Sequence, residues 1–334
     1  MTMLPEVKHY LIDVKFNLRL DPAKEGQIIR ELYTHFEERV RDLHQAGMSE
    51  HEAAKTATES LGGPKLVAKE IYRVYSIGSW HEAMMAALPH ILIALLFAYH
   101  LWQTPLWASI FLVAIVLVAL YGWRHSSPTW FYPWLGYSLV PLIIAAFVCT
   151  VTVAQFFSLR SLGMNLDPNA LALLAALAYL PIAFAITLWI VVRVVRRDWI
   201  YASLMALPLP FLAGWLYLVE RQGKLIEYDK QSFRQEDMGM TLIFLALAIT
   251  AAAFIRLRDR VLKVGSVILT ALLVFSIVSN YALGYPSLLW LIGTALVLVL
   301  FLLSPALLER KIGRGETNGE RLSDNWLEQV LGEG

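Results

Sequence analysis

Hydrophobic residues follow two contrasting patterns along this chain. Over the first 80 residues they recur every three or four positions, as in the stripe Ile28, Leu32, Phe36, Val40 and Leu43. This spacing predicts an amphipathic helix with one buried face. Over residues 81–307 the chain is almost continuously apolar, which indicates helices that lie in a membrane.

Helix start and stop signals divide the first 80 residues into four short helices. The first covers about residues 6–17, and Asp21-Pro22 supplies an N-cap and a first-turn proline for the second. Gly47 ends the second helix, and Ser49 to Glu52 reads as a capping box for the third.

The segment Leu61-Gly62-Gly63-Pro64 ends the third helix and starts the fourth. The apolar face of the fourth helix is predicted to comprise Leu66, Val67, Ile71, Val74 and Tyr75. Four helices of this size form only a marginal core, so we expect the domain to pack against another surface. Acidic and basic residues are dense here and nearly balanced in number.

Eight apolar stretches are each long enough to cross a bilayer, which takes about 20 residues. They cover residues 82–102, 104–123, 135–157, 171–193, 199–219, 239–255, 262–282 and 286–307. The sequence therefore predicts an all-α, polytopic membrane protein with eight transmembrane helices. Its expected parts are a small N-terminal helical domain (1–80), the membrane region (81–307) and a tail (308–334) with a short amphipathic helix.

Basic residues gather in alternate loops, which sets the expected orientation. Twelve lie on the side of the N-terminal domain: Arg124, Arg193, Arg196, Arg197, Arg256, Arg258, Arg260, Lys263, Arg310, Lys311, Arg314 and Arg321. Five lie on the other side: Arg160, Arg221, Lys224, Lys230 and Arg234. Both termini are therefore expected in the cytosol.

A short motif recurs at the start of the first and fifth spans. Residues 80–89 and 199–208 both read W-x-x-A-x-x-x-A-L-P. This match predicts a parallel repeat of four plus four helices, with chance similarity as the alternative. Pro89 and Pro208 are expected to kink their helices because each removes a backbone hydrogen bond.

Composition excludes several classes of protein. The chain is 57% hydrophobic and 16% charged, and it has a single Cys, so a soluble enzyme of ordinary composition, a disulfide scaffold and a Cys-built metal site are all excluded. The net charge of +1 gives no reason to expect nucleic-acid binding. No cofactor is expected.

Motifs for hydrolase, protease or ATPase chemistry are absent from the sequence, and no Asp or Glu lies between Glu82 and Asp167. The two mid-span ionisable residues are His90 and His100, both in the first span. We interpret His90 as bonded to a neighbouring carbonyl and His100 as lying near the outer interface. The alternative is contact of His90 with a chromophore, a quinone or a lipid.

Charged and amphipathic segments provide candidate docking surfaces. Acidic residues cluster on the longest helix of the first domain, namely Glu31, Glu37, Glu38 and Asp42. The loops with Arg196, Arg197, Arg256 and Arg258 are basic, so we expect the acidic cluster to pack there. Trp326 lies on the apolar face of a short segment in the tail, which would lie on the membrane or dock on a protein.

The N-terminal segment resembles the HAAS-type signalling domain, or permease prefix domain. The resemblance runs through Tyr10-Leu11, Glu31-Leu32 with His35, residues 47–53, residues 61–64 and Ala68, and Gly63 stands where the family usually has Asp. It covers about residues 5–75. It implies a protein of the bacterial cytoplasmic membrane, of a kind often linked to PadR-type regulators or permeases, and it implies no catalytic residues.

These patterns together predict a non-enzymatic regulatory or sensory membrane protein whose helical domain acts by docking. The alternatives are a permease or lipid-handling protein, and a structural accessory subunit of a larger membrane complex. The expected partners are membrane lipids and a protein bound through the N-terminal domain or the tail.

Overall fold

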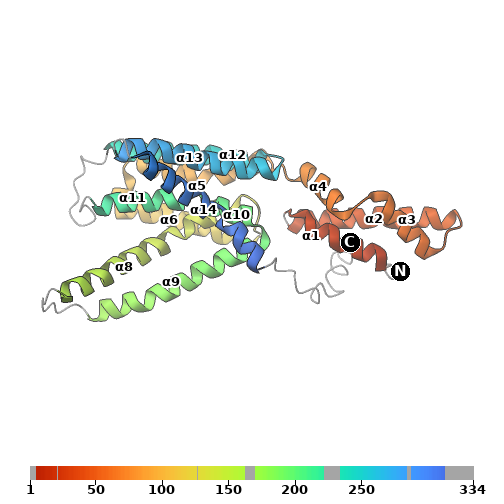
Figure 1. Cartoon of the computed structure of the whole chain (residues 1–334), viewed down its shortest axis with the longest axis horizontal. Helices are drawn as coiled ribbons and strands as arrows, with labels where there is room; N and C mark the ends of the chain where they lie inside the picture. The colour runs from red at the N-terminus through yellow and green to blue at the C-terminus, as the bar shows by residue number, and fades with distance from the viewer. Residues whose placement is uncertain are drawn as a thin grey trace.

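The computed structural model describes residues 5–20, 22–125, 127–161, 170–221, 234–283 and 287–312. Over these residues the fold is all-α, without a β-strand, as predicted. A small helical domain lies at one end of a bundle of long apolar helices (Figure 1).

The small domain comprises α1 (Pro5–Leu18), α2 (Pro22–Gln45), α3 (Glu50–Leu61) and α4 (Pro64–Tyr75). The predicted stripe of α2 faces its core, in which Phe36 packs edge-on against Tyr10 with ring centroids 5.2 Å apart. Gly47 adopts a left-handed φ of 97° just after α2, and Ser49 and Glu52 form the predicted capping box. The four predicted helices are confirmed, although Asp21 is outside the described residues.

The buried face of α4 differs from the predicted one. Leu66, Val74 and Tyr75 are exposed, whereas Ala68 and Tyr72 are buried. Ala68 lets α4 pack closely against α1, and Tyr72 points toward charged residues of the bundle. The orientation of α4 about its own axis is thus set by two neighbours, α1 and the charged residues of the bundle. The apolar stripe of α4 does not reveal its contact with the bundle.

The bundle is built from eleven helical segments in the described residues. In chain order they are α5 (Trp80–Ala98), η1 (Leu101–Gln103), α6 (Pro105–Arg124), α7 (Phe131–Ser138), α8 (Val140–Ser161), α9 (Ala170–Arg197), α10 (Trp199–Ala206), α11 (Leu209–Arg221), α12 (Arg234–Arg256), α13 (Arg260–Leu283) and α14 (Leu288–Ile312). Within the described part of the chain, eight spans are long and apolar enough to cross a membrane. The predicted class, a multi-pass helical membrane protein, is confirmed.

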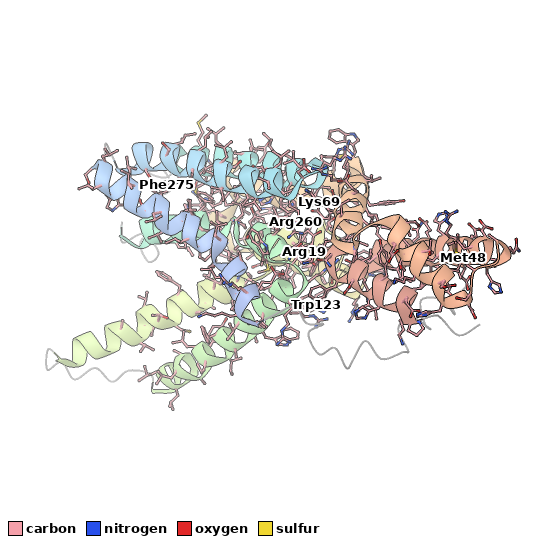
Figure 2. All side chains as sticks on the ribbon, turned by 45° about the vertical axis from the view of Figure 1, so that its right-hand side comes forward. Arg19, Met48, Lys69, Trp123, Arg260 and Phe275 are labelled. Carbon is pink, nitrogen blue, oxygen red and sulfur yellow. The ribbon has the colours of Figure 1, made fainter. Side chains whose placement is uncertain are left out.

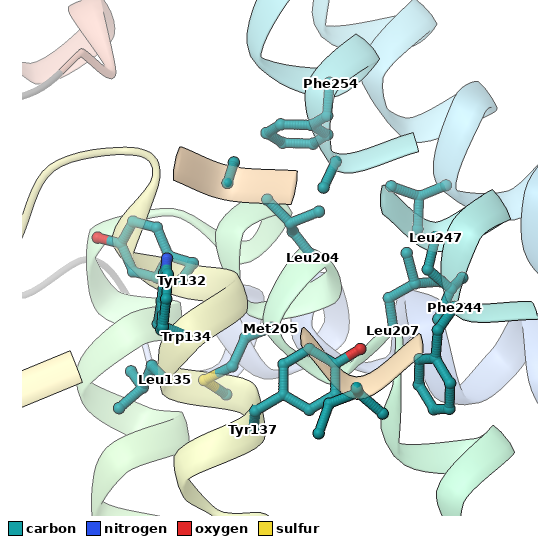
Figure 3. Packing of buried hydrophobic residues seen from close by; sticks show 14 of the residues in the cluster. Tyr132, Trp134, Leu135, Tyr137, Leu204, Met205, Leu207, Phe244, Leu247 and Phe254 are labelled. Atoms are coloured by element: carbon teal, nitrogen blue, oxygen red, sulfur yellow. The ribbon is translucent and has the colours of Figure 1, made fainter. Parts of the chain in front are cut away.

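Three of the eight spans form the inside of the bundle. Half or more of the residues are buried in the spans of α5, of α10 with α11, and of α12, against 11–22% in the other five. Figure 3 shows aromatic residues of α7 packed beside α10 and α12. Gly136 is required in α7, because a Cβ there would lie 2.2 Å from the carbonyl oxygen of Met205 in α10.

The two proline motifs have different structural surroundings. The helix breaks at Pro208, between α10 and α11, while α5 continues through Pro89. The main neighbour of α5 is α12, the sixth span, so a four-plus-four repeat requires α10 to pack on α6, the second span. Instead α10 packs on α7, α14 and α9. The packing of α5 on α7 has a counterpart in that of α10 on α13, whereas the packing of α5 on α12 has none between α10 and α6, so the repeat stays a prediction.

Candidate functional site

The basic ends of the spans gather on one face of the bundle, and the small domain attaches to this face. Figure 2 shows Arg19 of the domain beside Arg260 of the bundle at this junction. The C-terminal ends of α6, α9, α12 and α14 meet here. The sequence predicts these ends on one side of the membrane, because successive loops lie on opposite sides.

Asp198 is the central residue of the junction. It lies between α9 and α10 and is 3% exposed. One of its carboxylate oxygens caps α10 by accepting the Ile200 N–H at 3.1 Å. Arg260 donates two hydrogen bonds to the same carboxylate, at 2.6 and 2.8 Å, in the bidentate geometry typical of strong charge-assisted pairs.

Arg19 connects the small domain to this buried pair. Its Nη1 lies 3.9 Å from Asp198, and its Nη2 lies 3.6 Å from Glu309 at the end of α14. Its backbone φ of 53° is left-handed, an uncommon conformation for a residue other than glycine, at the turn between α1 and α2. Burial lowers the pKa of Arg19, and nearby Arg260 lowers it further.

Tyr72 of α4 covers the other side of the cluster. The Arg260 guanidinium lies 5.6 Å and the Lys263 ammonium 5.5 Å from the centre of its ring, both within cation–π range. Burial raises the pKa of Tyr72 to about 12, so its hydroxyl is neutral at physiological pH. Lys263 also donates to the Ser76 carbonyl at 3.2 Å, which joins α13 to the end of α4.

The connection between α4 and α5 is clamped to the end of α12. The Gly78 N–H donates to the Ile255 carbonyl at 2.9 Å, and Arg256 donates to the Gly78 carbonyl at 2.8 Å while lying over the Trp80 ring. A Cβ at Gly78 would lie 2.4 Å from the Ile255 side chain, so this approach requires glycine. The Ser76 hydroxyl donates to the Arg258 carbonyl at 2.9 Å.

Two additional ion pairs, which are solvent-exposed, lie around the cluster. Arg73 lies 3.3 Å from Asp259, and Lys24 lies 3.8 Å from Glu82. Exposed pairs of this kind each contribute about 0.2–1 kcal/mol. The contacts that cross the junction are therefore mostly polar and charged, and Asp198 and Lys263 are buried members of the cluster.

The structure places some of the predicted docking residues in the junction and others away from it. Arg256 and Arg258 lie in the junction. Glu37, Glu38 and Asp42 lie in the distal half of α2, where Tyr33 donates to Glu37 at 2.7 Å and His35 pairs with Glu38. The cluster begins 13 residues beyond Lys24, which pairs with Glu82 of the bundle, and so lies about 20–27 Å farther along α2. The expected packing of this cluster on the basic loops is not formed.

The remaining docking candidates also differ from the expected arrangement. Arg196 is exposed, and Arg197 donates to the Ser127 carbonyl at 2.6 Å and lies over the rings of Tyr132 and Tyr201. Trp326 lies outside the described residues. The residues that sequence reasoning missed are Arg19, Tyr72 and Asp198. The available signal was Asp198 itself, a lone acid in a basic loop directly before an apolar span.

The two span histidines form separate contacts. His90 is fully buried, and its Nδ1 lies 2.6 Å from the Tyr137 hydroxyl, so its partner is a tyrosine and not the expected carbonyl. His100 lies at the end of the bundle away from the domain, where it and Trp102 contact Asp237. Asp237 is fully buried, although its sequence position indicated an outer loop.

Comparisons with family models, curated proteins and solved structures find no match for this chain. In the described residues, no group of three or more His, Cys, Asp or Glu side chains is placed to hold a metal ion. The polar junction between the domain and the bundle is thus the candidate functional site.

Proposed function

We propose that this chain is a non-enzymatic regulatory or sensory integral membrane protein whose helical domain acts by docking on the bundle. The observation that carries the proposal is the Arg19–Asp198–Arg260 arrangement. It ties the domain to a carboxylate that also caps α10, so a change in docking alters the charge balance at a buried helix start.

The polar character of the junction supports reversible docking. Charged contacts of this kind lose less on exposure to water than an apolar core does, because water solvates the separated charges. Residues 5–75 have a hydrophobic core of their own, which supports separation of the domain from the bundle without unfolding.

We further propose that the domain is a HAAS-like signalling module on the cytosolic side of a bacterial cytoplasmic membrane. The excess of basic residues on the domain side supports this orientation. A protein partner would bind the domain, the tail or the exposed face of α4, and the bundle would be surrounded by lipid.

Hydrogen exchange tests the proposal in the full-length protein in nanodiscs. The variant is Arg19→Ala, and the matched control is Arg39→Ala, which removes an exposed charge from the distal part of α2. Arg19→Ala should raise exchange at residues 198–201 while the domain core stays protected. Equal exchange in both variants, or no change at residues 198–201, would contradict communication between the domain and the bundle.

A second arm measures the proteins retained in mild detergent. A regulatory role predicts that the amount of at least one retained protein changes with Arg19→Ala and stays constant with Arg39→Ala. Identical sets in the parent and both variants would contradict a role that depends on docking.

A further inference from the structure

A second feature lies on the outside of the bundle, between α6 and the hairpin of α8 and α9. Figure 1 shows α8 and α9 diverging from the other helices. The space where they leave the bundle is a cavity of about 420 Å³, within the range of about 300–1,000 Å³ typical of small-molecule sites. Its lining is almost wholly apolar and includes Leu120, Trp123, Leu142, Ile186, Trp189 and Ile190.

The cavity follows the direction of the helices. Its lining on α6 runs from Val116 to Trp123, a rise of about 10 Å, and so reaches from the interior of the span to its basic end. Leu120, Ile186 and Trp189 are each about half exposed. An apolar groove that is open to the side of a membrane-spanning bundle faces lipid chains.

A cationic aromatic cluster closes the basic end of this groove. The Trp123 and Trp189 rings stack with centroids 5.8 Å apart, and the Arg193 guanidinium lies 4.5 Å and 5.5 Å from their centres. Arg193 is exposed, as are Arg124 and Arg196 at the same end. Tryptophan and arginine together at a span end are typical of the headgroup level of a bilayer.

We propose that this groove binds an anionic phospholipid, with an acyl chain between α6 and α9 and the phosphate at Arg193. The chemistry of the site changes in the same order as that of a lipid, from an apolar interior to a cation at the interface. Arginine stacked on indole keeps its N–H groups free to bind phosphate oxygens. An apolar helix of another protein would fill the groove but leave Arg193 without an anion.

The proposal is independent of the docking function, because it requires only that the bundle lies in a membrane. The test uses full-length protein in mild detergent and native mass spectrometry. The probes are phosphatidylglycerol and phosphatidylcholine with identical acyl chains. The parent protein should bind phosphatidylglycerol roughly fivefold more tightly, because one arginine near a surface phosphate contributes about that factor.

Four variants separate the groove from general charge. Arg193→Gln should remove the preference for phosphatidylglycerol, and Arg193→Lys should keep most of it. Arg310→Gln removes an exposed charge at the end of α14 and should leave the preference intact. Ile186→Trp fills the groove and should weaken binding of both lipids.

Equal affinity of the parent protein for the two lipids would overturn the proposal. Equal losses in Arg193→Gln and Arg310→Gln would also overturn it, because the preference would then come from overall charge. Unchanged lipid binding in Ile186→Trp would show that the lipid lies elsewhere. If Arg193→Gln fails to fold, loss of the preference in Arg193→Lys would count against the site.

Discussion

The interior of the small domain and its junction with the bundle are held together by opposite kinds of interaction. The interior consists of apolar side chains such as Leu11, Ile29 and Phe36 that are almost fully buried. The junction consists of ion pairs, capped helix ends and cation–π contacts around Asp198. Folding of the domain and its attachment to the bundle are therefore separable, because they depend on different residues. Substitutions in the apolar interior affect folding, and substitutions of charged junction residues affect attachment.

The largest expected effect comes from a change in the interior of the domain that alters no residue of the junction. Phe36→Ala removes a ring that is 1% exposed and packs against Tyr10, which costs about 3–5 kcal/mol. Hydrogen exchange should show α1–α4 unprotected while the spans remain protected. Retained protection of the domain core in this variant would show that the core is not what holds the domain together.

The next effect breaks the junction and spares the interior. Asp198→Asn keeps a side-chain oxygen to cap α10 but removes the charge that pairs with Arg260, whose side chain is 24% exposed. Breaking a buried pair costs about 3–5 kcal/mol, and the exposure of Arg260 reduces this to about 2–3 kcal/mol, most of it lost within the bundle because Asp198 and Arg260 both belong to it. The docking contact that is lost directly is that of Arg19 with the Asp198 carboxylate. The domain should undock without unfolding, which proteolysis between residues 75 and 80 together with domain exchange would detect. Loss of domain protection would contradict separability.

A smaller effect is expected at the close approach of the linker. Gly78→Ala places a Cβ against Ile255, a nearly fully buried residue, and the clash costs about 1–3 kcal/mol of overpacking. Thermal unfolding of the bundle should shift to lower temperature, and Gly63→Ala, which has open space around its Cβ position, should change it little. Equal shifts in the two variants would argue against a tight linker contact.

The smallest expected effect concerns the acidic cluster of α2. Charge reversal at Glu37, Glu38 and Asp42 should leave docking within about 0.5 kcal/mol of the parent, because Glu38 and Asp42 are exposed and Glu37 is bonded to Tyr33 of the same helix. Increased proteolysis at residues 75–80 in the triple variant would instead support packing of the acidic cluster on the basic loops.

Local sequence patterns predicted most of the fold but little of the junction. Gly47, the Ser49–Glu52 box and the stripe of α2 determine structure within a few residues of themselves, so the domain helices were predictable. The spans were predictable because length and apolarity decide them. The pairing of Arg19 with Asp198 joins residues 179 positions apart, and no local pattern reports such a contact.

Charge alone was a misleading guide to docking. The acidic cluster of α2 and the basic loops match in sign, but the length of α2 carries that cluster away from the bundle. The repeat motif is also a weak guide to packing, because the main neighbour of α5 is α12, while α10 packs mainly on α7 and α14. In both cases the tertiary placement of a helix decides which of its residues make contact.

A distance measurement between the domain and the bundle tests the central claim most directly. Nitroxide labels at Lys55 in α3 and Arg196 in α9, both exposed, are placed in a Cys149→Ser background and reconstituted in nanodiscs. Double electron–electron resonance should give one narrow distance distribution, which broadens when Asp198→Asn is added. A broad distribution without that change, or an identical narrow one with it, would contradict docking through Asp198.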